Sequence, residues 1–155
     1  MKRMIFIIMA LLLVFCAIPV SAAEIGDGDF SYIEAGETSR TEDTDCQLTV
    51  TSECPSGFGL GAYVILSDAD GQMYRISMSE ENGYKEQIFL KSGEYSVIET
   101  KIYDDNTGKY PFDQTKGEEM FSLESGASGE IAFRLRDYDA IEAVIAEKEF
   151  ESVAL

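Results

Sequence analysis

The segment LKSGEYSVIET, residues 90–100, decides the fold class of this 155-residue chain. A Ser-Gly turn signal stands at 92–93, and the residues after it alternate as they do along an extended strand, with Tyr95, Val97 and Glu99 on one face. Further alternating segments lie on both sides, separated by turn residues roughly every eight to twelve positions. This spacing is typical of β-sandwiches, so the sequence predicts an all-β fold of seven short strands in a single sandwich domain.

Two of the turns between these strands carry glycine. They are Asp-Ala-Asp-Gly at 68–71 and Glu-Asn-Gly at 81–83. Glycine adopts the left-handed conformation that tight turns need, so both segments predict hairpins between consecutive strands.

The first 23 residues have the pattern of a signal peptide. A basic start, Lys2-Arg3, precedes the apolar run 4–20, and the small residues that follow predict cleavage after Ala22 or Ala23. An uncleaved anchor helix is the alternative, because an apolar run of roughly 17 residues approaches the shortest membrane span. We therefore expect a secreted protein, or one in the extracellular cell envelope, that meets a membrane only through an uncleaved leader. The predicted segments are a signal peptide at 1–23, an acidic linker or arm at 24–45, the sandwich at 46–138, and a tail at 139–155 that forms a short helix or an extra strand.

The chain is strongly acidic. It has 29 Asp and Glu against 12 Lys and Arg, and the net charge of −17 becomes −19 when Lys2 and Arg3 leave with the signal peptide. Nucleic acids and anionic membrane surfaces bind clustered basic residues, so the charge disfavours both as partners. The absence of histidine excludes Ser-His-Asp and Cys-His catalysis and His-containing zinc sites. We therefore expect no nucleic-acid partner; taken with the family resemblance described below, we expect a non-enzyme without a cofactor whose partner is a protein or glycan at the cell surface, and the oligomeric state stays open.

Two cysteines bracket the first strand of the predicted sandwich. Cys46, Leu48, Val50, Ser52 and Cys54 alternate onto one face. Two cysteines in a secreted chain favour a disulfide, but eight steps of extended chain span roughly 26 Å, whereas bridged Cα atoms lie within about 7 Å. Either the strand ends early and folds back to close a bridge, or both cysteines are buried thiols on the core face. A bond between two chains is a third reading.

Loops at the ends of sandwich strands carry recognition in many binding proteins. The segments 55–61 and 104–117 are loops by composition, and we expect them to form the binding surfaces. The candidate binding residues are Phe58, Leu60, Asp104, Asp105, Asn106 and Tyr110.

Acidic and amide side chains in two turns resemble parts of calcium-binding loops. They are Asp68, Asp70, Asp104 and Asn106. Neither turn has the later bidentate glutamate of such loops, so plain turns are expected and no metal site is predicted. A calcium site assembled from both turns is the alternative.

Between residues 47 and 136 the chain resembles the Cna B-type, prealbumin-like repeat modules of surface proteins and pilins in Gram-positive bacteria. The resemblance rests on a signature in which a small residue and glycine precede an aromatic residue, an apolar alternation, and a glutamate followed by threonine. The matching residues are Leu90, Ser92, Gly93, Tyr95, Val97, Glu99 and Thr100. The resemblance implies a prealbumin-like (Ig-like) sandwich at the cell surface.

Many such modules form an intramolecular isopeptide bond between a lysine on the first strand and an asparagine on the last, promoted by a buried glutamate. Glu99 falls at the glutamate position, Ser52 or a neighbour stands where the lysine would be, and only Asp137 and Asp139 lie near the end of the last strand. The resemblance therefore implies that the bond is absent here and that Glu99 is an ordinary sheet residue.

These observations favour a non-catalytic binding or structural module, adhesion- or pilus-like. The alternative is a carbohydrate-binding or accessory domain of a secreted polysaccharide enzyme. A flat exposed row among Tyr63, Tyr84, Tyr103 and Tyr110 would favour that alternative. An autocatalytic cross-linking domain is the third hypothesis.

Overall fold

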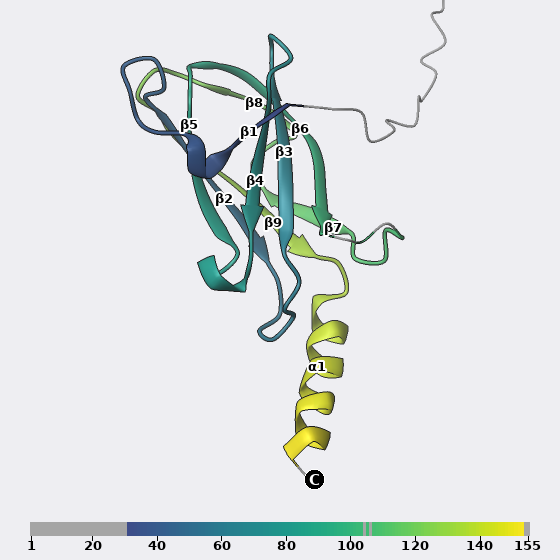
Figure 1. Cartoon of the computed structure of the whole chain (residues 1–155). Helices are drawn as coiled ribbons and strands as arrows, with labels where there is room; N and C mark the ends of the chain where they lie inside the picture. The colour runs from purple at the N-terminus through teal and green to yellow at the C-terminus, as the bar shows by residue number, and fades with distance from the viewer. Residues whose placement is uncertain (1–30, 104, 106, 154–155) are drawn as a thin grey trace, which may run out of the picture.

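The computed structural model describes residues 31–103, 105 and 107–153, and it contains two β-sheets and a C-terminal helix (Figure 1). Sheet A has the strand order β1-β4-β3-β6-β8, and sheet B has the order β5-β2-β9-β7. The predicted signal peptide, residues 24–30, Asp104 and Asn106 lie outside the described residues. The elements are β1 (Tyr32–Glu34), η1 (Ala35–Glu37), β2 (Cys46–Glu53), β3 (Ala62–Asp68), β4 (Met73–Met78), η2 (Glu80–Asn82), β5 (Lys85–Leu90), β6 (Gly93–Ile102), β7 (Phe112–Lys116), β8 (Met120–Leu123), β9 (Ser128–Leu135) and α1 (Tyr138–Val153).

The all-β, sandwich-like prediction is confirmed, but the described residues contain nine strands rather than seven. The additional strands are β1 and β7. The sequence predicted that β1 would be part of the acidic linker or arm at 24–45 and that β7 would be part of the loop at 104–117. β1 pairs in parallel with β4, and β7 pairs antiparallel with β9. Both strands are short and lie at sheet edges, so their conformation depends on these partners more than on their own sequence.

The predicted acidic arm is part of the folded domain from residue 31 onward. Ala35 is buried in the core, and the hydroxyl of Thr38 accepts a hydrogen bond of 3.0 Å from the backbone N–H of Phe89 on β5. Glu34 forms an ion pair with Arg75 on β4. The burial of Ala35 and these two polar contacts therefore hold the acidic segment against both sheets.

β2 is central to sheet B and follows the predicted alternation. Cys46, Leu48, Val50 and Ser52 are buried, and the residues between them are partly exposed. The strand pairs antiparallel with β5 and in parallel with β9, so that Val50 lies opposite Ile131. Because β9 is the last strand, this pairing joins the two ends of the sandwich sequence.

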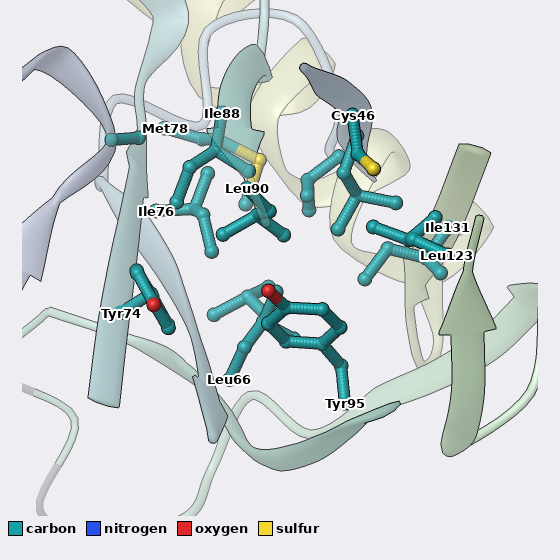
Figure 2. Packing of buried hydrophobic residues seen from close by; sticks show 14 of the residues in the cluster. Cys46, Leu66, Tyr74, Ile76, Met78, Ile88, Leu90, Tyr95, Leu123 and Ile131 are labelled. Atoms are coloured by element: carbon teal, nitrogen blue, oxygen red, sulfur yellow. The ribbon is translucent and has the colours of Figure 1, made fainter. Parts of the chain in front are cut away.

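The core lies between the two sheets and is almost entirely aliphatic and aromatic. Figure 2 shows Ile76 of sheet A close to Ile88 and Leu90 of sheet B, with Leu66 and Tyr95 side by side below them. These aliphatic side chains are fully or almost fully buried. Each one stabilises the fold by about 1.5–3 kcal/mol relative to exposure.

The two segments predicted to form hairpins, 68–71 and 81–83, differ in the structure. Asp68 to Gly71 closes the predicted hairpin between β3 and β4. The segment at 81–83 was also expected to form a hairpin, but it is the end of η2 and carries the chain from sheet A to sheet B. Gly83 has the left-handed conformation, with φ 64°. The glycine therefore marks the point where the chain reverses direction. The sheet that the next strand joins depends on where the apolar face of that strand is buried.

One end of the sandwich carries the helix. The loop 55–61, η2 and the residues after β6 lie at the end where β9 leads into α1 (Figure 1). We call this the helix end. The 68–71 hairpin lies at the opposite end, because β3 runs from Ala62 at the helix end to Asp68. Of the two alternatives expected for the tail, a short helix or an extra strand, the structure has the helix. No helix in the described part of the chain is long and apolar enough to cross a membrane.

Candidate functional site

The two predicted binding loops lie side by side at the helix end. The ring of Phe58 meets the ring of Tyr110 edge to face, with centroids 5.3 Å apart. The backbone N–H of Tyr103, at the start of the second loop, donates to the carbonyl oxygen of Gly61 over 2.8 Å. Residues about 50 positions apart in the chain thus form one surface, which we call the loop surface.

The first loop is anchored by hydrogen bonds that leave one apolar side chain exposed. The hydroxyl of Tyr84 donates to the carbonyl oxygen of Leu60 over 2.9 Å, and the N–H of Gly57 donates to the carboxylate of Glu80. Gly57 and Gly59 have φ values of 75° and 70°, which other residues adopt at a cost. Leu60 remains 40% exposed, so the loop presents an apolar group on a fixed backbone.

A carboxylate organises the second loop. Asp105 is only 8% exposed and accepts hydrogen bonds from the backbone N–H groups of Tyr110, Lys109 and Thr107 and from the hydroxyl of Thr107. The bonds from Tyr110 and Thr107 are the largest influences that lower its pKa to about 2. Both carboxylate oxygens are occupied, so Asp105 fixes the loop rather than facing a ligand. Asp105, which the sequence suggested as a binding residue, therefore stabilises the conformation of the second loop.

Of the turn residues considered for calcium, Asp68 and Asp70 belong to the hairpin at 68–71, whereas Asp104 and Asn106 lie outside the described residues. Asp68 accepts hydrogen bonds from the N–H groups of Asp70 and Gln72 and from the hydroxyl of Tyr74. It lies in the hairpin opposite the helix end, whereas Asp105 lies at the helix end. Among the described residues, no group of three or more Asp, Glu or Cys side chains is placed to hold a metal ion.

Glu99 lies on the outer face of sheet A, contrary to the alternation expected for β6. A bulge shifts the register, so that Val97 pairs with Leu66 while Glu99 pairs with Ile65. Glu99 is exposed and accepts a hydrogen bond of 3.2 Å from the hydroxyl of Tyr63. The extra residue reverses the side-chain parity, and Thr100 faces the core opposite Val64.

Ser52 lies on the inner face of sheet B, where the resemblance places a lysine. It is 1% exposed, and its hydroxyl has no hydrogen-bond partner. Glu99 points away from the core, so the two positions that the resemblance connects are on different faces of the sandwich. This geometry provides no carboxylate beside Ser52 to promote a cross-link.

The two cysteines stand at opposite ends of β2. Cys46 is buried, Cys54 is partly exposed, and both thiols are free in the structure. The thiol of Cys46 donates to the carbonyl oxygen of Glu124 over 3.0 Å. Burial raises the pKa of both thiols, that of Cys54 to about 12. Both are therefore protonated and unreactive at neutral pH.

The tyrosines do not form a flat row. Tyr63 and Tyr103 are neighbours on the outer face of sheet A, with ring centroids 5.1 Å apart, but their planes are inclined by 55°. Tyr84 is buried, and Tyr110 meets Phe58 at 85°. These four rings therefore do not form the flat exposed row that would favour the carbohydrate-binding alternative.

An arginine at the base of α1 was not anticipated from the sequence. The guanidinium of Arg134 on β9 lies 4.7 Å from the ring centre of Tyr138, 3.0 Å from the carboxylate of Asp139 and 3.8 Å from that of Glu53. Its neighbour Arg136 holds Asp113 of β7 through two guanidinium nitrogens. The alternation of β9 predicts that Arg134 faces outward, but only the pairing of β2 with β9 places Glu53 beside it, and only the pairing of β7 with β9 places Asp113 near Arg136.

No protein-family model matches the chain, and no curated protein sequence matches it. The resemblance to Cna B-type modules therefore stays a prediction that rests on the signature in β6.

Proposed function

We propose that this protein is a secreted or cell-envelope-associated binding or structural module, adhesion- or pilus-like, that acts without catalysis. The contact between Phe58 and Tyr110 carries the proposal, because it joins the two predicted loops into one surface on a rigid support. Exposed Leu60 supplies an apolar contact on that surface. A fixed backbone loses little conformational entropy on binding, which favours recognition of a protein.

The non-catalytic part of the proposal is supported by the state of Asp105. It is the one acidic side chain in the described part of the chain that is buried. A catalytic carboxylate needs an oxygen that is free to accept a proton, and both carboxylate oxygens of Asp105 already accept hydrogen bonds. Its pKa of about 2 makes it a poor base at neutral pH.

We further propose that seven of the nine strands have the prealbumin-like arrangement, with β1 and β7 as additions. Two features support this: the parallel pairing of β2 with β9, and the division of the other five strands between the sheets. Localisation outside the cell membrane rests on the predicted signal peptide, and the intact mass of protein from the culture medium tests it. A chain that begins at Ala23 or Glu24 is the expected result.

A binding experiment tests the function. The mature protein is applied to purified cell walls of the producing bacterium, to immobilised matrix glycoproteins such as collagen and fibronectin, and to a glycan array. We expect saturable binding to the wall or to a glycoprotein, and a loss of about tenfold or more in affinity for Leu60→Asp. Tyr84 donates to the backbone oxygen of Leu60, so this substitution leaves the anchor of the loop in place.

The matched control is Gln87→Asp, which adds the same charge at an exposed position on the outer face of sheet B. Binding that is lost equally in both variants would show a charge effect rather than a loop site. Binding to the glycan array alone, unaffected by Leu60→Asp, would replace the proposal with the carbohydrate-binding alternative. No binding to any of the three surfaces contradicts the adhesion function.

A further inference from the structure

Helix α1 leaves the sandwich and extends away from it (Figure 1). It contacts the strands at its first residues, where Tyr138 lies under Arg134 and Asp139 pairs with the same guanidinium. Beyond these residues no strand in the described part of the chain packs along the helix. Within the described part of the chain, the helix is therefore held at its base and no strand packs along the rest of it.

The exposed part of α1 has an apolar stripe. Ile141, Val144 and Ile145 follow the i, i+3, i+4 spacing that places side chains on one face; Val144 is 51% exposed, and Ile141 and Ile145 are half-buried. All three are β-branched, and such residues have lower helix propensity than straight-chain ones. An isolated helix of this length is marginal in water, and its stability usually comes from packing of its apolar face.

The charges on α1 point to the kind of surface that packs there. The helix has five acidic residues and a single lysine, Lys148, and its last turn has no basic residue. Glu142 and Glu147 are exposed and flank the apolar stripe on its two sides. Because no basic residue in the last turn offsets the helix dipole, positive charge that approaches this end of the helix stabilises it.

We propose that α1 docks into an apolar groove rimmed by Lys and Arg on a partner protein. Ile141, Val144 and Ile145 fill the groove, and Glu142 and Glu147 face the basic rim. A second copy of this chain is a poor occupant, because each copy has a net charge of −17 and the two helices would repel each other. This inference does not depend on the loop surface or on the function proposed for it.

Photo-crosslinking in cells that produce the protein identifies the partner. The probe is p-benzoylphenylalanine at position 144 of the full chain, and the control has the same residue at Gln87 on the outer face of sheet B. We expect one protein to be crosslinked from position 144 and not from position 87. Its crosslinked residues should line an apolar groove with Lys or Arg at the rim.

Affinity measurements on the purified pair test the chemistry. Ile145→Asp should lower the affinity about tenfold or more, and Glu142→Lys together with Glu147→Lys should lower it similarly. Binding should weaken as salt rises to about 0.5 M, because the rim contacts are screened. The control is Ala143→Gln on the opposite face of the helix, which should leave the affinity within about twofold.

Several outcomes overturn the proposal. They are crosslinks only to another copy of the chain, crosslinks only to lipid, no crosslink from position 144, or a partner whose affinity is unchanged by Ile145→Asp. Circular dichroism of the variants shows whether the helix persists. A variant that loses the helix is replaced by Ile145→Gln, which keeps helix propensity and removes the apolar contact.

Discussion

The core and helix α1 place similar side chains in opposite surroundings. Ile76 and Ile88 lie between the sheets with no exposed surface, whereas Val144 on α1 is half exposed. The core residues are fixed by neighbours from both sheets (Figure 2), and the helix is held only at its base (Figure 1). The comparison separates two roles, because burial makes the sandwich stable and exposure makes the helix available to a partner.

The largest expected effect is the loss of a core side chain. Leu66→Ala should lower the free energy of unfolding by about 2–5 kcal/mol, because it removes fully buried methyl groups and leaves a cavity. Val144→Ala on the helix is the matched control and should change it by less than about 0.5 kcal/mol. Urea unfolding followed by far-UV circular dichroism measures both. Equal losses would mean that the helix is part of the cooperative core.

The loop surface should depend on the charge of Asp105. Its pKa of about 2 lies below the ordinary value of 3.8, so the folded state favours the ionised carboxylate. This contribution to stability is present above the unfolded pKa and is lost as the pH falls from about 4 toward 2. Asp105→Asn should therefore melt at a lower temperature than the wild type at pH 7, and the difference should shrink over that range.

Thermal melts of the two proteins between pH 7 and pH 2 check this prediction. Asp70→Asn is a suitable control, because Asp70 is exposed and its hydrogen bond to Asp68 uses only its backbone N–H. A melting difference for Asp105→Asn that is constant with pH would show that the side chain acts through shape and not through its charge.

The unpartnered hydroxyl of Ser52 should give a smaller effect of opposite sign. Ser52→Ala removes a buried polar group that makes no hydrogen bond, so stability should rise by about 1 kcal/mol. Ser77→Ala is the matched control, because the Ser77 hydroxyl lies 2.6 Å from that of Tyr103. That change should lower stability by about 0.5–1.5 kcal/mol. A destabilised Ser52→Ala protein would indicate a hydrogen bond that forms in solution.

The fold class was predictable because the longer strands have strong alternation. β2 shows the buried and exposed sequence that its residues indicate, and the hairpin at 68–71 closes as its glycine predicts. β1 and β7 were not predictable, because their strand conformation comes from pairing with β4 and β9. Local sequence carries no signal for such a partner.

The candidate site shows the same limit. Composition identified the two loops, but only the fold brings Phe58 to Tyr110. Strict alternation of side chains along a strand does not predict the bulge in β6. This single extra residue moves Glu99 from the inner face to the outer face. The support that Asp105 gives to its loop depends on several backbone N–H groups, which sequence patterns do not locate.

Removal of the helix should have the smallest effect on stability and gives the sharpest test of the comparison. A chain that ends at Asp137 loses the contacts of Arg134 with Tyr138 and Asp139, which are exposed and worth about 1 kcal/mol or less together. We expect its urea midpoint to stay close to that of the full chain, while the helical signal in circular dichroism disappears. If the shortened chain fails to fold, then α1 stabilises the sandwich, and the separation of a stable core from a helix available for binding is wrong.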